Sequence, residues 1–223
     1  MHPLTLATLA STLALASAAC NDYTLINARG TGELQGESIG FRTMIDQVLA
    51  AVPNGSIYNV VYPAAPDITQ QTTSIGSSDI ARFIQTGLSS CPQQRYVLLG
   101  YSQGATVVNR ALQAFPPTSR QGQAISAVVQ IGNPYHLPDR RGNVDDMCGT
   151  STAGASGALL ATSDYEVPEG WYGTGRVRDI CYEGDGVCMG FDAGNVFSGS
   201  HLFYGFSQSV ADCGSGFIVE KLG

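Results

Sequence analysis

Residues 100–104, Gly-Tyr-Ser-Gln-Gly, match the pattern G-x-S-x-G. This pattern is typical of a sharp turn from a strand into a helix, in which the two glycines leave room for the neighbouring chain and the serine hydroxyl points outward. An apolar run at 96–99 precedes the pattern, and helical spacing follows it over 105–115. The sequence therefore predicts that Ser102 is an exposed nucleophile. The alternative is an ordinary glycine-rich turn without a chemical role.

A serine hydroxyl becomes a nucleophile when a neighbouring base takes its proton, and histidine is the usual base. The sequence contains His2, His136 and His201. With a serine in such a turn, the partners follow along the chain in the order serine, acid, histidine. No Asp or Glu occurs between Ser102 and His136, so we predict His201 as the base. His136 is interpreted as a surface or loop-packing residue.

The acid is expected between residues 103 and 200, and Asp185 stands out because Cys181 and Cys188 flank it. If these cysteines pair, a short covalent loop would fix the direction of the carboxylate, which must hold the imidazole in one tautomer. A solvated aspartate in a turn is the alternative for Asp185. The other carboxylates in this range include Asp139, Asp145, Asp146, Asp164, Asp179, Asp192, Glu166, Glu169 and Glu183.

Attack on a carbonyl carbon creates an oxyanion that needs hydrogen-bond donors. One donor is the backbone N–H of the residue after the nucleophile, here Gln103, and the second comes from a loop after an early strand. Residues 28–31, Ala-Arg-Gly-Thr, occupy that position, and Thr31 offers both an N–H and a hydroxyl. The alternative for Thr31 is a plain Gly-Thr turn.

The elements that must position these side chains alternate between strands and helices. Apolar or β-branched runs predict strands at 23–28, 57–62, 96–99, 127–131 and 177–181. Helical spacing predicts helices at 38–52 and 105–115, and a partly helical tail at 202–222. A further helix has Ile75, Ile80, Phe83, Ile84 and Leu88 on one face. This alternation favours a parallel sheet covered on both faces, with a long loop at 138–175.

Composition limits the function classes. The chain has 223 residues, enough for one sizeable domain. Its net charge of −7 disfavours nucleic acid as a partner. Residues 1–19 are predicted to be a signal peptide, with small residues at 17–19 as the cleavage site; a buried first helix is the alternative. The mature protein is then expected to span 20–223 as one secreted, monomeric domain without a membrane segment.

All six cysteines lie in the predicted mature part, which favours disulfides in a secreted protein. Six cysteines allow 15 pairings, and the sequence alone does not choose among them. No spacing typical of a metal site occurs, so we expect no metal and no other cofactor. The triplet Asn54-Gly55-Ser56 is an N-glycosylation sequon and indicates a surface loop.

Five segments of the chain resemble the cutinase family, which also includes acetylxylan esterases. They are the Ala-Arg-Gly-Thr loop at 28–31, the serine turn at 100–104, Gly-Asn-Pro at 132–134, the acid loop at 181–188 and Ser-His-Leu-Phe-Tyr-Gly at 200–205. They occur in the family's order and span almost the whole mature chain. The resemblance implies that Ser102, Asp185 and His201 form a catalytic triad, with an oxyanion hole at Thr31 and Gln103.

The resemblance also implies the fold and the disulfides. The expected fold is a compact α/β-hydrolase, a three-layer sandwich with about five parallel strands and no large lid. The implied pairs are Cys20–Cys91, Cys181–Cys188 and Cys148–Cys213, of which the last is not common to every family member. The region 139–175 is long for the family, which leaves substrate preference open.

The expected function is that of a secreted serine esterase acting on cutin-type polyester and on short-to-medium acyl esters. An apolar rim around the histidine would favour an acyl chain, unless its side chains only pack the core. The alternative activity is removal of acetyl groups from xylan, which needs a smaller pocket. A non-catalytic binding protein on the same fold is a remote alternative. The rim residues are Val196, Phe197, Leu202, Phe203 and Tyr204.

Overall fold

The structure, a computed structural model, describes residues 20–190 and 199–223. Within these ranges, six strands form one sheet in the order β2-β1-β3-β4-β6-β5, and all neighbours are parallel. The predicted parallel sheet is therefore confirmed, with one strand more than the expected five. The strands are β1 (Tyr23–Ala28), β2 (Gly55–Asn59), β3 (Arg95–Tyr101), β4 (Ile125–Ile131), β5 (Asn143–Val144) and β6 (Val177–Ile180).

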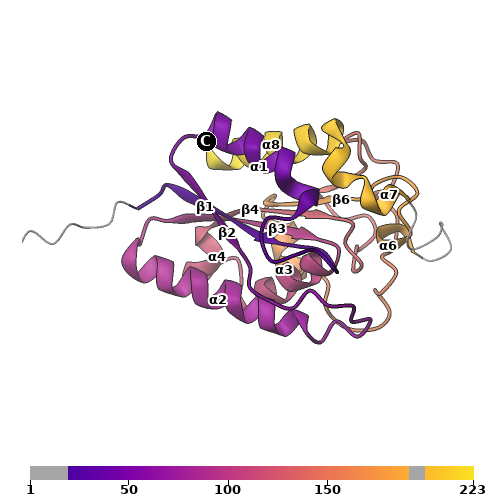
Figure 1. The fold of residues 1–223 in the computed structure, drawn as a ribbon, viewed down its shortest axis with the longest axis horizontal. Coiled ribbons are helices and arrows are strands. Elements are labelled where there is room, and N and C mark those ends of the chain that lie inside the picture. Colours follow the sequence, from indigo (N-terminus) through magenta and orange to yellow (C-terminus); the bar gives the residue numbers. More distant parts are fainter. Residues whose placement is uncertain (1–19, 191–198) are drawn as a thin grey trace, which may run out of the picture.

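Helices cover both faces of the sheet (Figure 1). On one face lie α1 (Arg42–Ala51) and α8 (Gln208–Leu222), and on the other lie α2 (Thr73–Ser90), α3 (Gln103–Ala114) and α4 (Arg120–Ala124). The short helices are α5 (Glu169–Tyr172), α6 (Gly186–Met189) and α7 (Gly199–Leu202), and single 3-10 turns span Ile39–Phe41 and Tyr204–Phe206. The result is the expected three-layer sandwich. No helix in the described ranges is both long and apolar enough to span a bilayer.

The continuous apolar runs in the sequence are explained by burial on both faces of the sheet. Every residue of β1 is buried. Leu25 and Leu99 face α1 and α8, whereas Ile26 and Leu98 pack among the side chains of α2 and α3. Because successive side chains of a strand point to opposite faces, each strand contributes to both cores. Complete burial of such a side chain is worth about 1.5–3 kcal/mol.

The second strand is shifted from its predicted position at 57–62. It begins at Gly55, whose Cα pairs with that of Tyr23, and ends at Asn59. The next N–H, of Val60, still donates to a β1 carbonyl, but the N–H of Val61 donates to the Asp79 carboxylate of α2. A side chain on the covering helix therefore ends the strand, and the sequence around 57–62 contains no signal for it.

Two further expectations are corrected. Ile75, predicted on the same helix face as the apolar residues that follow it, is 51% exposed near the start of α2, whereas Ile80, Ile84 and Leu88 are buried. The loop predicted at 138–175 also contains the edge strand β5 and the helix α5. The predicted signal peptide at 1–19, the candidate acid Asp192 and the rim residues Val196 and Phe197 lie outside the described residues.

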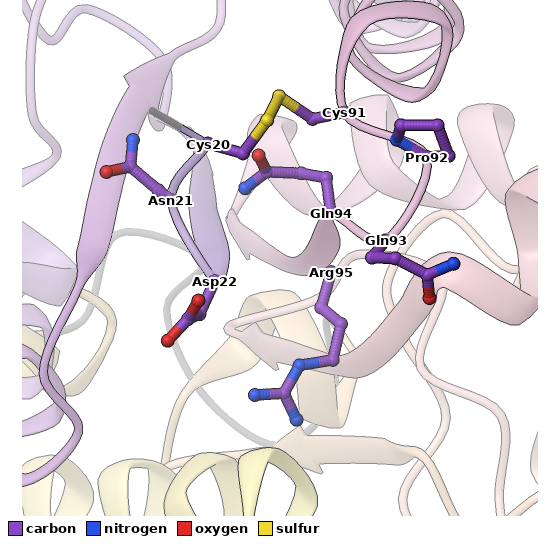
Figure 2. Close-up of a pocket in the computed structure, with 8 residues that line it drawn as sticks. All are labelled: Cys20, Asn21, Asp22, Cys91, Pro92, Gln93, Gln94 and Arg95. Atoms are coloured by element: carbon purple, nitrogen blue, oxygen red, sulfur yellow. A yellow bond between two sulfur atoms is a disulfide. The ribbon is translucent and has the colours of Figure 1, made fainter. Parts of the chain in front are cut away.

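Three disulfides join Cys20 to Cys91, Cys148 to Cys213 and Cys181 to Cys188, the pairing that the family resemblance implies. The first connects the start of β1 to the residue after α2 beside a hollow of about 310 Å³ (Figure 2). This hollow lies at the amino end of β3. The candidate active site lies at the carboxyl end of the same strand, where ligands bind in open parallel sheets.

Candidate active site

Ser102 lies at the turn between β3 and α3, in a backbone conformation that L-residues rarely adopt. Its φ is +54° and its ψ is −119°. A conformation of this kind costs of order 1–3 kcal/mol and persists only where the surrounding structure holds it. Here the Ser102 N–H donates to the carbonyl of Ile131 at 3.0 Å, and its carbonyl accepts from Ala105 N at 2.9 Å. Both neighbouring elements therefore fix the serine at the sheet edge.

The two glycines of the pattern are required because the backbone packs against them. A Cβ on Gly104 would lie 2.0 Å from the carbonyl oxygen of Ala28, at the end of β1. A Cβ on Gly100 would lie 2.7 Å from the Cα of Ala105. This is the close approach that the spacing of the pattern predicts.

Three polar side chains distant in sequence meet at this edge. Ser102 Oγ lies 3.0 Å from His201 Nε2. His201 Nδ1 lies 3.0 Å and 2.9 Å from the two carboxylate oxygens of Asp185. An ionised carboxylate only accepts hydrogen bonds, so Nδ1 carries the proton and Nε2 is free to accept the serine proton. Asp185 is fully buried and His201 is 6% exposed, so both are shielded from water.

Asp185 is held from several sides. It is the N-cap of α6, where its Oδ1 accepts the N–H of Val187 at 2.8 Å. Its Oδ2 accepts the hydroxyl of Tyr204 at 2.7 Å. The Cys181–Cys188 disulfide closes the loop around it. Beneath the pair lies Gly132, with φ +58°, where a Cβ would come within 2.8 Å of the His201 ring.

Several of the other carboxylates that were candidates for the acid form contacts with groups other than His201. Asp145 accepts three backbone N–H groups of its own loop, which lower its pKa although burial opposes this. Asp146 accepts the N–H of Glu183, and Glu169 pairs with Arg140. Among the described candidates, Asp185 is the carboxylate in contact with His201.

Of the two interpretations of His136, a surface residue or a loop-packing residue, burial excludes the first. His136 is fully buried, and its Nδ1 lies 3.1 Å from Oδ2 of Asp179, which is also fully buried. Asn143 Nδ2 lies 3.1 Å from its other ring nitrogen. The sequence missed this pair because Asp179 lies on β6, far along the chain.

Thr31 lies in the turn after β1, in a loop that Glu33 organises. The Glu33 carboxylate accepts the N–H of Gly30, the hydroxyl of Ser38 at 2.8 Å and the N–H of Ile39 at 2.7 Å. Arg29 donates to the Glu33 carbonyl from the other side at 2.8 Å. The sequence alone did not indicate a role for Glu33 or Arg29. The available signal for Glu33 was a carboxylate directly after the Gly-Thr-Gly turn at 30–32.

Gln103 is the first residue of α3, so its N–H is among those without a partner inside the helix. Its side chain is buried, and Nε2 donates to the carbonyl of Ala65 at 3.1 Å. This contact connects the start of α3 to the loop at 64–72, which forms one wall of the site.

A cleft of about 480 Å³ opens over Ser102 and His201. Ile68 and Leu202 lie on its walls and are 73% and 62% exposed. Tyr204, predicted on the rim, is instead buried beneath Asp185. A second hollow of about 240 Å³ shares Thr31, Tyr101 and Leu202 with the cleft. The cleft is lined by Thr31, Pro66, Asp67, Ile68, Gln70, Tyr101, Ser102, Val187, His201 and Leu202.

A family model described as Cutinase matches residues 19–222. The chain belongs to the cutinase family. A solved cutinase-like protein from Cryptococcus sp. is 42% identical, with a TM-score of 0.84 over 93% of this chain and 98% of that one. The catalytic core of an acetyl xylan esterase from Trichoderma reesei shares the fold, with a TM-score of 0.72 at 23% identity over 91% of this chain and all of that one.

Among curated relatives, carboxylesterase Culp1 of Mycobacterium tuberculosis is 37% identical over 137 residues. The match covers 56% of this chain and 62% of that protein, so this chain spans less than two thirds of that relative. The names of these relatives describe carboxylic ester hydrolases. No group of three metal-binding side chains occurs within residues 20–190 and 199–223.

Proposed function

We propose that this protein is a secreted serine esterase that hydrolyses carboxylic esters through an acyl-enzyme on Ser102. The observation that carries the proposal is the continuous contact from Ser102 Oγ to His201 Nε2 and from His201 Nδ1 to the Asp185 carboxylate. This is the geometry of a nucleophile, a base and a group that orients the base. The predicted leader and three disulfides support export to an oxidising compartment.

The reaction takes place in two halves. His201 Nε2 takes the hydroxyl proton while Ser102 Oγ bonds to the ester carbonyl carbon, whose π electrons move to oxygen. Collapse of this intermediate breaks the bond to the leaving alcohol, which receives the proton from His201. A water molecule, deprotonated by His201, then attacks the acyl carbon, so that the acid leaves and the Ser102 hydroxyl is restored. Asp185 stabilises the imidazolium that forms in each half.

The backbone N–H groups of Thr31 and Gln103 are proposed to bind the oxyanion. Thr31 lines the cleft that contains Ser102, and Gln103 follows Ser102 at the start of α3. Loss of one such donor typically costs about 2.7–4 kcal/mol of transition-state stabilisation. The charge of the oxyanion is therefore balanced by fixed backbone dipoles, without a cofactor.

The size and the apolar lining of the cleft favour esters with an apolar acyl chain, such as cutin-type polyester, as substrates. It is larger than an acetyl group requires, and its walls include Ile68, Val187 and Leu202. These side chains can bury a hydrocarbon chain, each CH₂ contributing about 0.8 kcal/mol. Rates on p-nitrophenyl acetate, butyrate and longer esters test this proposal. A steep fall in kcat/KM beyond acetyl would instead favour an acetylxylan esterase.

Labelling by a fluorophosphonate probe tests the nucleophile itself. We expect the wild type to be labelled at Ser102, and Ser102→Ala to lose both labelling and hydrolysis of p-nitrophenyl butyrate. The matched control is Ser89→Ala, an exposed serine on α2, which should behave as the wild type. Unlabelled wild type would favour the non-catalytic binding protein, and full activity of Ser102→Ala would refute the role of Ser102.

A further inference from the structure

Tyr204 lies beneath the proposed triad and contacts its acid directly. Its hydroxyl oxygen accepts the backbone N–H of Tyr182 at 2.9 Å and lies 2.7 Å from Asp185 Oδ2. A backbone N–H can only donate, so the hydroxyl proton is directed at the carboxylate. We propose that Tyr204 is a positioning residue that sets the direction and the basicity of Asp185, and through it the proton affinity of His201. This inference rests on the proposed function.

The hydroxyl of Tyr204 stays protonated in the working range of the enzyme. The side chain is 1% exposed. Burial and the charge of Asp185 raise the pKa of Tyr204 well above its ordinary value of 10.0. It is therefore a permanent donor to the carboxylate, and it competes with His201 for the negative charge of Asp185.

The ring of Tyr204 is fixed by its aromatic neighbours. It packs edge-on against Tyr101, Tyr182 and His201, with ring centroids 5.9, 5.8 and 6.2 Å away. Tyr101 in turn donates its hydroxyl to the carbonyl of His201 at 2.7 Å. Since the ring cannot rotate away without losing these contacts, the hydroxyl points at Asp185 Oδ2 in the resting enzyme.

Removal of the hydroxyl has a consequence with a definite sign. In Tyr204→Phe, Asp185 keeps its bonds to Val187 N–H and His201 but loses one donor, so more of its charge acts on the imidazolium. The acid limb of kcat/KM, which reports the protonation of His201, should move up by about 0.5–1 pH unit. Because Asp185 is also less well directed, kcat should fall about 3-fold to 10-fold.

The other ionisable groups near Asp185 and His201 do not explain a shift of the acid limb in Tyr204→Phe. The charge of Asp185 raises the pKa values of Tyr101 and His136, and the charge of Glu33 also raises the pKa of Tyr101. All three groups are unchanged by Tyr204→Phe. Tyr96→Phe is the matched control, because Tyr96 is also buried, and its hydroxyl has no hydrogen-bond partner in the described part of the chain. It should leave the pH profile unchanged.

The decisive experiment is the pH profile of kcat/KM for wild type, Tyr204→Phe and Tyr96→Phe on p-nitrophenyl butyrate. A second variant with 3-fluorotyrosine at 204 has a more acidic, stronger donor and should move the acid limb down, opposite to Tyr204→Phe. It tests the proposal even if Tyr204→Phe does not fold. Shifts of the acid limb in opposite directions in the two Tyr204 variants support the proposal. An unmoved limb in folded, fluorophosphonate-labelled variants overturns it, whereas a wild type without labelling or activity would refute the proposed function instead.

Discussion

At the scale of single residues, the described part of the chain contains two His–Asp pairs in different surroundings. His201 and Asp185 reach the cleft through Ser102, whereas His136 and Asp179 are both fully buried. Asp179 also accepts a hydrogen bond from the side-chain amide of Asn133 at 2.8 Å. Asn133 directly follows Gly132, which packs against the His201 ring. Burial opposes charge on His136, but the Asp179 carboxylate outweighs this effect, so the pKa of His136 is raised. The second pair therefore supports the turn on which the first pair rests.

This raised pKa predicts a pH dependence of stability. Unfolded histidine has a pKa of about 6.5, so the stabilisation by charged His136 is complete below that pH and is lost as pH rises through the higher folded value. The variant His136→Gln lacks this stabilisation at every pH. We expect a deficit of about 3 kcal/mol at pH 5 that shrinks towards pH 9.

Melting temperatures of the wild type and His136→Gln from pH 5 to pH 9 measure this effect. Asp179→Asn removes the same ion pair from the other side and should lose the same pH dependence. A deficit in His136→Gln that is constant over the whole pH range would show that His136 contributes only packing and neutral hydrogen bonds.

Residues with local signals could be predicted from the sequence, and those with distant partners could not. Ser102 lies within a five-residue pattern, and Asp185 lies between two close cysteines. Tyr204 was predicted on the rim because its spacing reveals neither the Tyr182 N–H nor Asp185, which lie 22 and 19 residues away. The partner of His136 could not be predicted for the same reason, since Asp179 lies on another strand.

At the scale of elements, the loop after β1 is shaped mainly by two of its own side chains. Glu33 gathers three donors of the loop, and Arg29 donates to the carbonyls of Glu33 and of Tyr62 beyond β2. The loop is therefore preorganised before substrate arrives, as the proposed role of Thr31 as an oxyanion donor requires. The order of strands and helices was predictable from periodicity. The end of β2 was not, because Asp79 on α2 determines it.

Glu33→Gln should disturb this loop while the proposed triad stays intact. The amide keeps one acceptor oxygen but turns an NH₂ group towards donors that the carboxylate had satisfied. We expect kcat to fall about 10-fold with KM within about 2-fold, since an oxyanion donor acts mainly in the transition state. Steady-state kinetics on p-nitrophenyl butyrate provide the measurement.

The neighbouring Glu37 offers a control for this variant. Its carboxylate lies 3.9 Å from Arg42 on the helix that follows the loop. Glu37→Gln changes the charge by the same amount and should retain kcat. Equal losses in the two variants would indicate a general effect of charge rather than positioning of the loop by Glu33.

At the scale of the whole molecule, the three disulfides have different tasks. Cys20–Cys91 and Cys148–Cys213 join residues 71 and 65 positions apart, whereas Cys181–Cys188 spans only 7. In the chain-entropy model, closing such loops stabilises the fold by about 4 kcal/mol for each long one and about 2 kcal/mol for the short one. The short loop fixes Asp185 within 7 positions, whereas the loop closed by Cys148–Cys213 contains both Asp185 and His201 but spans 65 positions.

Stability and activity should therefore separate among the three double alanine variants. Replacing Cys20 and Cys91 should cost about 4 kcal/mol of stability but little activity at 25 °C, because that bond lies at the amino end of β3, opposite Ser102. Replacing Cys181 and Cys188 should cost about half as much stability but at least about 10-fold in kcat, since the Asp185 carboxylate is no longer fixed. Denaturant unfolding and kinetics on the same samples test this. If activity instead falls in proportion to lost stability in all three variants, the short disulfide has no specific role in directing the acid.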